Sequence, residues 1–116
     1  MTIRFDQLPG FKKELKRLTK KYRTLPEDLQ EFQRVVSAIP LGNSKHFNVM
    51  TNTGAVQVVK ARFFCRALKG SSLRVIYGYL EKRNQIDFIE LYFKGDKENE
   101  DRMRIKDYIS THITSK

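Results

Sequence analysis

Three cations lie in two neighbouring apolar segments and could together hold an anion. Lys60 and Arg62 are two residues apart in AVQVVKARFFC, and Arg74 lies in SLRVIYGYL. Both segments are rich in β-branched and aromatic residues, which predicts strands, and residues two apart on a strand project from the same face. Cations fixed on strands suit a phosphodiester better than cations on flexible loops. The pattern fits the solvated face of an antiparallel sheet equally well, and spacing does not separate the two interpretations.

The other residue types that carry chemistry are scattered along the chain. His46 and His112 are far apart, and Cys65 is the single cysteine. A metal site needs clustered His, Cys or carboxylate ligands, so we expect no metal. There is no recognisable histidine partner for a Ser or Cys nucleophile and no glycine-rich phosphate loop, so we expect no cofactor either. Because Cys65 lies in an apolar run, it is interpreted as a small buried hydrophobic residue.

The charge balance points to a polyanionic partner. The 116 residues include 23 Lys and Arg against 13 Asp and Glu, a net charge of +10. Such an excess is typical of proteins that bind nucleic acid. An acidic protein and an anionic lipid surface are alternatives, and a small basic protein can also be merely soluble. The length predicts one domain that spans residues 1–116.

Cysteine usage and hydropathy predict the compartment. A single cysteine excludes an intramolecular disulfide, and the first ten residues, MTIRFDQLPG, lack the apolar stretch of a signal peptide. No run approaches the roughly 18 consecutive apolar residues of a membrane helix. We therefore expect a soluble, cytoplasmic protein with no membrane partner.

Two amphipathic helices are predicted after a short strand at IRFDQL. The first helix places Phe11, Leu15, Leu18 and Tyr22 on one face. Its other face carries cations that could bind RNA or could only keep the helix solvated: Lys12, Lys13, Lys16, Arg17, Lys20 and Lys21.

The second helix begins after a very short link. Thr24 and Glu27 have the spacing of a capping box, and apolar residues repeat from Leu29 to Ile39 until Pro40 ends the pattern. The short link predicts an antiparallel helical hairpin.

Three strands and a third helix are predicted in the remainder. The strands cover residues 55–65, 72–80 and 85–93, and the hairpin-like connections LKGSS and EKRNQ make them antiparallel. The pattern does not resolve whether HFNVM is a further short strand. Ile105, Tyr108, Ile109 and His112 have helical spacing. The predicted fold class is therefore α+β, a small single domain with an antiparallel sheet of about four strands, an N-terminal helical hairpin and a C-terminal helix.

The turn before the last helix mixes both signs of charge. Lys94 and Lys97 alternate there with four acids, Asp96, Glu98, Glu100 and Asp101. Carboxylates that precede a helix complement the positive end of its dipole. We therefore expect the acids to have a structural role and Lys94 to be better placed for chemistry than the residues that follow it.

The order of these elements and their residues resembles the RelE/ParE superfamily of type II toxins of bacteria and archaea. The matching stretches are VVKARFFC, SLRVIYGYLE, IDFIELYFKGDKEN and the helix that follows. Within the superfamily the chain is most similar to the RelE and HigB-like branches. In these, an Arg-aliphatic-aliphatic-Tyr strand precedes a strand that ends in Tyr and a basic turn. The resemblance covers nearly the whole chain and is best from Val56 to Tyr108.

This resemblance implies a toxin that cleaves mRNA in the ribosomal A site and thereby inhibits translation, with a cognate antitoxin as its partner. Such an endoribonuclease needs no metal. By the family pattern, Lys60 and Arg62 correspond to paired cations, Arg74 to the arginine beside the scissile phosphate, and Lys94 and Lys97 to the basic turn that closes the site.

The resemblance also suggests roles. Lys60 is the candidate base, because neighbouring cations lower the pKa of a lysine. Arg62 and Arg74 would stabilise the charge on the phosphorane.

The chain departs from the family pattern in two respects. Some relatives use a C-terminal tyrosine, for which Tyr92 and Tyr108 are the candidates, although Tyr108 is predicted to be in the core. Other branches use histidines, and the predicted strands contain none. Two alternatives stay open: a ParE-like inhibitor of DNA gyrase, which shares the fold without nuclease residues, and a catalytically inactive toxin-like protein that binds only an antitoxin or RNA. The three strand cations favour the nuclease.

Overall fold

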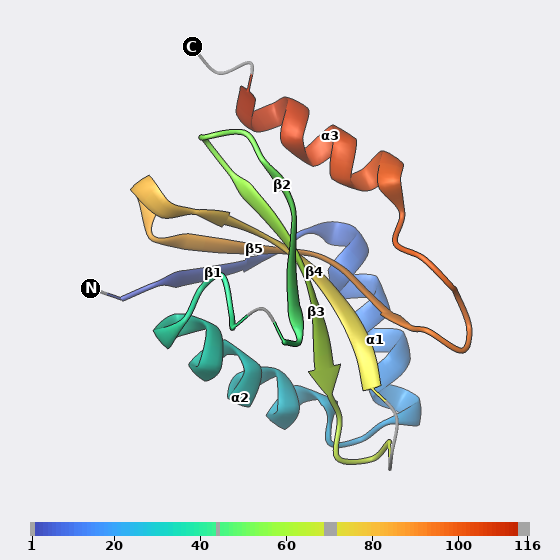
Figure 1. Cartoon of the computed structure of the whole chain (residues 1–116). Helices are drawn as coiled ribbons and strands as arrows, with labels where there is room; N and C mark the ends of the chain where they lie inside the picture. The colour runs from blue at the N-terminus through green and yellow to red at the C-terminus, as the bar shows by residue number, and fades with distance from the viewer. Residues whose placement is uncertain (1, 44, 69–71, 114–116) are drawn as a thin grey trace.

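Three helices and five strands make up the computed structural model, which describes residues 2–43, 45–68 and 72–113. In chain order the elements are β1 (Arg4–Gln7), α1 (Pro9–Lys21), α2 (Leu25–Ala38), β2 (Phe47–Asn52), β3 (Gln57–Phe64), β4 (Ser72–Leu80), the 3₁₀ turn η1 (Glu81–Arg83), β5 (Gln85–Phe93) and α3 (Arg102–Ile113) (Figure 1). Part of the predicted LKGSS connection, residues 69–71, lies outside the described residues.

The strands form one sheet in the order β1-β5-β4-β3-β2. β2, β3, β4 and β5 pair in antiparallel fashion with their neighbours, and β1 pairs with β5 in parallel. The α+β class, the helical hairpin and the C-terminal helix are confirmed. Two details differ from the prediction: the sheet has five strands rather than about four, and its parallel edge strand makes it mixed. HFNVM contributes to β2, an edge strand in which half of the residues are exposed and none is fully buried, so that its alternation is too weak to be recognised.

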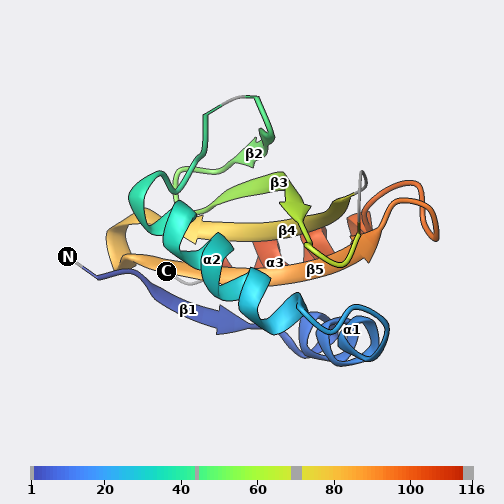
Figure 2. The ribbon, with the colours of Figure 1, turned by 90° about the horizontal axis from the view of Figure 1, so that it is seen from below.

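The sheet separates two hydrophobic clusters (Figure 2). On one face, α1 and α2 bury residues such as Phe11, Leu18 and Phe32 against the sheet. On the other face, α3 contributes Ile105 and Tyr108. We call these the hairpin face and the α3 face.

Strand alternation sends the cations to the α3 face. In β3, Val59, Ala61 and Phe63 are buried in the cluster on the hairpin face, so Lys60 and Arg62 project from the opposite face.

The start of α2 differs from the prediction, whereas the start of α3 agrees with it in part. The capping box at Thr24 is wrong: its side chain makes no capping bond and its hydroxyl donates instead to Asp28. At α3 the prediction holds for Asp101, whose carboxylate accepts hydrogen bonds from the backbone N–H groups of Met103 and Arg104. Asp96 and Glu98 are exposed in the turn.

Glu14 of α1 bonds both β5 and α3 at the edge of the sheet. β1 pairs with β5 only as far as Phe88. Beyond that point the Leu91 N–H donates to Glu14 at 3.0 Å, and the Arg104 guanidinium bonds both Glu14, at 2.6 Å, and the Ile89 carbonyl oxygen. These side chains satisfy backbone groups that would otherwise be unpaired.

Gly78 allows α3 to approach the sheet closely. A Cβ atom at Gly78 would overlap the ring of Tyr108, whose hydroxyl donates to Asp87 at 2.8 Å. We expect Gly78→Ala to lower the unfolding free energy by about 1–3 kcal/mol, because overpacking displaces the ring. Thermal denaturation measures this loss as a fall in Tm of about 5 °C or more.

A double-mutant cycle separates the overlap from a general strand effect. With Tyr108→Leu, which shortens the side chain, the double variant should be less destabilised than the sum of the single variants. Additive losses would show that α3 does not pack on Gly78.

Candidate active site

A basic depression lies where β2, β3 and β4 adjoin. It has a volume of about 380 Å³ and is lined by Lys45, His46, Phe47, Asn48, Lys60, Ala61, Arg62 and Arg74. Lys60, Arg62 and Arg74 were predicted from the sequence, and the structure brings all three together. The depression carries four Lys and Arg side chains and no carboxylate among its lining residues.

Arg62 and Arg74 are the central pair of this depression. The antiparallel register places them directly opposite each other on adjacent strands. Like charges in this arrangement destabilise a sheet. Within the described part of the chain, neither guanidinium forms an ion pair with a carboxylate. The Arg74 Nη1 donates to the Ser72 hydroxyl at 2.8 Å, but no described carboxylate offsets the repulsion, and an anion bound between the two arginines would relieve it.

Two arginines that pack near the sheet do have carboxylate partners. Arg104 bonds Glu14, and Arg66 bonds Asp28 at 2.9 Å and Glu27 at 2.6 Å. Exposed cations such as those of α1 form no ion pair with a carboxylate in the described part of the chain, so the Arg62–Arg74 pair is set apart by its direct cross-strand register rather than by the missing carboxylate alone.

Lys60 does have a partner. Its ammonium lies 3.0 Å from a carboxylate oxygen of Glu100, whose side chain is only 4% exposed. Burial would lower the pKa of Lys60, but the hydrogen bond to Glu100 and the interactions with the Glu100 and Tyr92 side chains together outweigh it and raise the pKa above its ordinary value. The expectation that neighbouring cations lower this pKa is therefore wrong for the structure described here. Glu100, which contributes to the higher pKa of Lys60, lies 40 residues away in the sequence.

Tyr92 is buried beside this ion pair. Burial raises the pKa of its hydroxyl, although the Lys60 ammonium acts in the opposite direction. In the described part of the chain the hydroxyl has no hydrogen-bond partner. By register Tyr92 lies opposite Arg74, which places an unsatisfied hydroxyl on the α3 face. Tyr108 is instead buried and bonded to Asp87, in agreement with the prediction that it belongs to the core.

The turn cations Lys94 and Lys97 do not line the basic depression. Lys94 is exposed on the turn, and Lys97 pairs with the fully buried Glu90 while its ammonium lies over the Tyr92 ring. Glu90 also accepts the Asp101 N–H at 2.8 Å. The buried acids therefore fasten the turn against the sheet. Glu100 has this role rather than the helix-dipole role that was predicted.

His46 is the residue of this site that the sequence analysis missed. It immediately precedes β2, and its carbonyl oxygen accepts the Arg62 N–H at 2.9 Å. Its imidazole lines the depression from just before β2, so a histidine reaches the site although the predicted strands contain none. Recognition of HFNVM as an edge strand would have placed His46 next to the strand cations, but the sequence pattern did not resolve that strand.

The α1 cations are exposed but lie elsewhere. Five predicted RNA-binding residues of this helix are solvent-accessible: Lys12, Lys13, Lys16, Arg17 and Lys20. Because α1 covers the hairpin face, they form a surface separate from the basic depression.

The described residues contain neither a cluster of metal-ligating side chains nor a membrane-spanning helix. Within residues 2–43, 45–68 and 72–113, no three His, Cys, Asp or Glu side chains gather in a way that could hold a metal ion. No helix there combines the length and apolar character needed to cross a bilayer.

Comparison with known proteins relates this architecture to solved structures. Archaeal RelE from Pyrococcus horikoshii OT3, crystallised in complex with RelB, superposes with a TM-score of 0.60 at 24% identity, over 82% of this chain and 98% of the other. A mutant of toxin RelE from E. coli in the free state gives a TM-score of 0.59 at 16% identity, over 96% and 98%. The chain has a RelE-like fold. No family model matches the sequence, and no curated protein matches it.

The Lys60–Glu100 pair should make stability depend on pH. Burial would raise the pKa of Glu100, but a backbone hydrogen bond and Lys60 bring it below its ordinary value of 4.5. Its contribution is therefore complete above pH 4.5 and is lost as the pH falls through the lower, folded-state value. Glu100→Gln should cost about 1–2 kcal/mol of unfolding free energy at neutral pH, and the difference from wild type should shrink in acid. Urea titrations from neutral pH into acid measure this difference in unfolding free energy.

Glu98→Gln is the matched control, because it removes the same charge from an exposed residue of the same turn. It should follow the wild-type curve. A constant difference between Glu100→Gln and wild type at every pH would show that the ion pair does not contribute.

Proposed function

We propose that this chain is the toxin of a type II toxin–antitoxin system and a ribosome-dependent endoribonuclease. In this proposal it acts in the cytoplasm, cleaves mRNA in the A site and so inhibits translation. The RelE-like fold supports the class, and fold by itself leaves function open. The observation that carries the proposal is the Arg62–Arg74 pair, two opposed guanidinium groups that lack a carboxylate partner among the described residues.

The proposed reaction is an internal transfer at one phosphate. The ribose 2′-hydroxyl loses its proton to a base and attacks the adjacent phosphorus. The bond to the 5′-oxygen of the next nucleotide breaks, and that oxygen takes a proton from an acid. The products are a 2′,3′-cyclic phosphate and a free 5′-hydroxyl. Guanidinium groups stabilise the negative charge of the phosphorane, because they are preorganised donors at the place where charge develops.

Arg62 and Arg74 are assigned to the phosphate on this scheme. Lys60 remains in the proposed machinery, but as a charged group held by Glu100 it suits charge stabilisation better than proton abstraction. His46 is proposed for proton transfer, since it lines the depression and an imidazole can exchange protons near neutral pH. Lys94 stays a proposed catalytic residue and Lys97 a proposed RNA contact, although neither lines the depression and Lys97 would have to leave Glu90.

The proposed partners follow from charge. Ribosomal RNA and mRNA would meet the exposed α1 cations as well as the depression. A cognate antitoxin is proposed because the archaeal RelE was crystallised with RelB. An acidic antitoxin would cover a surface of a chain with a net charge of +10.

Removal of one guanidinium of the central pair should slow cleavage strongly. We expect Arg74→Ala to lower the cleavage rate about 10²–10³-fold, because one preorganised donor to the phosphorane is lost. The measurement is to map mRNA ends in a reconstituted translation reaction, with and without ribosomes. Ends within codons should appear only with ribosomes and wild-type protein.

Arg83→Ala is the matched control, since it removes an exposed arginine beyond the far end of β4. It should cleave at the wild-type rate. Intact message with wild-type protein would instead favour gyrase inhibition or an inactive binding protein.

Binding to ribosomes should depend on salt through the α1 cations. Each phosphate contact contributes about 0.7–0.9 to the slope of log affinity against log salt concentration. We expect Lys12→Ala/Lys16→Ala to reduce this slope by about 1.5 units, as measured by ribosome co-sedimentation. Lys82→Ala/Lys106→Ala, which removes two exposed lysines elsewhere, should leave it unchanged. Equal slopes for the wild type and both double variants would show that the α1 cations do not contact ribosomal RNA.

A further inference from the structure

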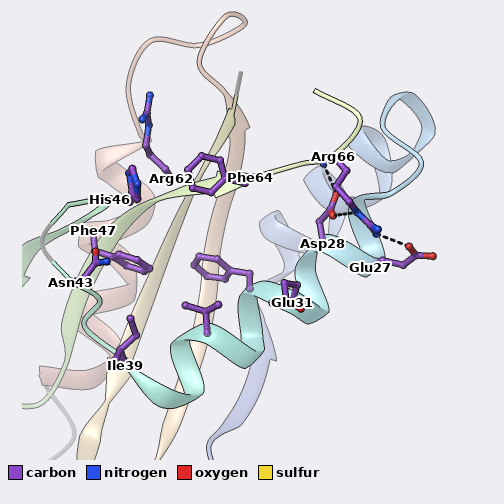
Figure 3. Close-up of a pocket in the computed structure, with 12 residues that line it drawn as sticks. Glu27, Asp28, Glu31, Ile39, Asn43, His46, Phe47, Arg62, Phe64 and Arg66 are labelled. Atoms are coloured by element: carbon purple, nitrogen blue, oxygen red, sulfur yellow. Dashed lines mark hydrogen bonds and ion pairs between the residues drawn. The ribbon is translucent and has the colours of Figure 1, made fainter. Parts of the chain in front are cut away.

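A second, larger hollow adjoins the basic depression. It lies between α2 and the end of β3, has a volume of about 590 Å³, and is lined by both apolar and polar side chains (Figure 3). Its apolar lining includes Phe32, Val35, Ile39, Phe47 and Phe64. Volumes of this size are typical of small-molecule sites. We call it the α2–β3 cavity.

The cavity exists because β2 begins late. β2 pairs with β3 only from Phe47, opposite Ala61, so that Arg62 to Phe64 extend beyond it. The edge of β3 is therefore uncovered by β2 beside α2. Arg62 and Phe64 are two residues apart and project from the same side of this segment.

Phe64 is unusual for an aromatic residue on a strand because 59% of it is exposed. The His46 ring packs against it at 5.3 Å between centroids, nearly perpendicular at 86°. In the described part of the chain, the buried Nδ1 of His46 has no hydrogen-bond partner. The open ring of Phe64, held by the His46 ring beside it, can therefore offer a stacking face to one flat ligand.

The two hollows share their border. Arg62, His46 and Phe47 line both of them. In Figure 3, Arg62, His46 and Phe64 gather at one end of the cavity, and Arg66, Asp28 and Glu27 lie at the other. A ligand that crosses this border would have an anionic part among the cations and a flat part against Phe64.

The acids of the cavity are neutralised. Asp28 and Glu27 both bond Arg66, and Glu31 bonds Arg34 at 2.6 Å. These three carboxylates share two guanidinium groups, and the charge of Arg62, which also lines the cavity, balances the third.

We propose that the α2–β3 cavity is a nucleobase subsite, in which an unpaired base next to the phosphate held by Arg62 and Arg74 stacks on Phe64. This inference rests on the proposed function and adds to it a named recognition residue. Single-stranded RNA is recognised through bases that leave the stack and rest on aromatic side chains. A base bound here would fix which phosphate reaches the cations. Phe64 is therefore a substrate-positioning residue, and the choice of base depends on the cavity that surrounds it.

The test compares two RNA probes on the intact protein. Both are single-stranded pentanucleotides with 2′-O-methyl groups, which prevent the transfer reaction. One probe carries 2-aminopurine beside the central phosphate, and the other carries an abasic residue there; both flanks of the phosphate are examined. On one flank, wild-type protein should bind the base-containing probe about tenfold more tightly and quench its fluorescence.

Variants assign the difference to the cavity. Phe64→Ala should remove the preference and the quenching, whereas Phe64→Tyr, which keeps a ring, should retain both. Val49→Ala, which truncates an exposed apolar residue of β2 outside the cavity, should behave as wild type. Because Phe64 is exposed, its replacement is not expected to unfold the protein, and thermal denaturation checks this directly.

The outcomes separate this inference from the proposed function. Arg74→Ala should weaken both probes equally, since it acts on the phosphate alone. If Arg74→Ala weakens binding but wild-type protein shows no preference for the base, the nucleobase subsite is wrong and the phosphate site stands. If Phe64→Ala leaves both affinities unchanged, the apolar lining belongs to a protein contact. If Arg74→Ala changes neither affinity, the proposed function itself fails.

Discussion

The register between β3 and β4 is the constraint on which the site depends. It places Arg62 opposite Arg74, and no described carboxylate pairs with either. A shift of β3 by one residue would turn the Arg62 guanidinium into the hydrophobic cluster beneath the helical hairpin, because strand residues alternate between faces. Val59, Ala61 and Phe63 prevent that shift, since they are fully or almost fully buried on the hairpin face. Burial of one face thus fixes an electrostatically unfavourable arrangement on the other.

The acidic turn before α3 has a different function from the one its sequence indicates. Asp101 caps the helix, but Glu100 reaches Lys60 and Glu90 holds Lys97. These pairs fasten the turn to the sheet and keep two cations engaged. In a chain with a net charge of +10, buried acids at this point control which cations are available to an anionic ligand. Arg62 and Arg74 form no ion pair with a described carboxylate, whereas Lys60 and Lys97 do.

The early end of the β2–β3 ladder joins two kinds of surface. Beyond Ala61, β3 is uncovered by β2, and an apolar cavity reaches the basic depression through Arg62 and His46. RNA has the matching arrangement, because each charged phosphate lies next to a flat, uncharged base. The proposed nuclease and the proposed base subsite are therefore one continuous surface built from the end of a single strand.

Periodicity within the sequence was sufficient for the α+β class, both N-terminal helices, three central strands and the cations Lys60, Arg62 and Arg74, because these are local patterns of burial and charge. It did not resolve β2, whose edge position leaves it half solvated, nor the parallel pairing of β1 with β5. Contacts between distant segments were decided only by the tertiary structure. Glu100 meets Lys60 across 40 residues and raises its pKa, and His46 joins the depression from beside an unrecognised strand. Neither is visible in sequence, because spacing along a chain specifies which face a residue occupies but not which distant side chain it meets there.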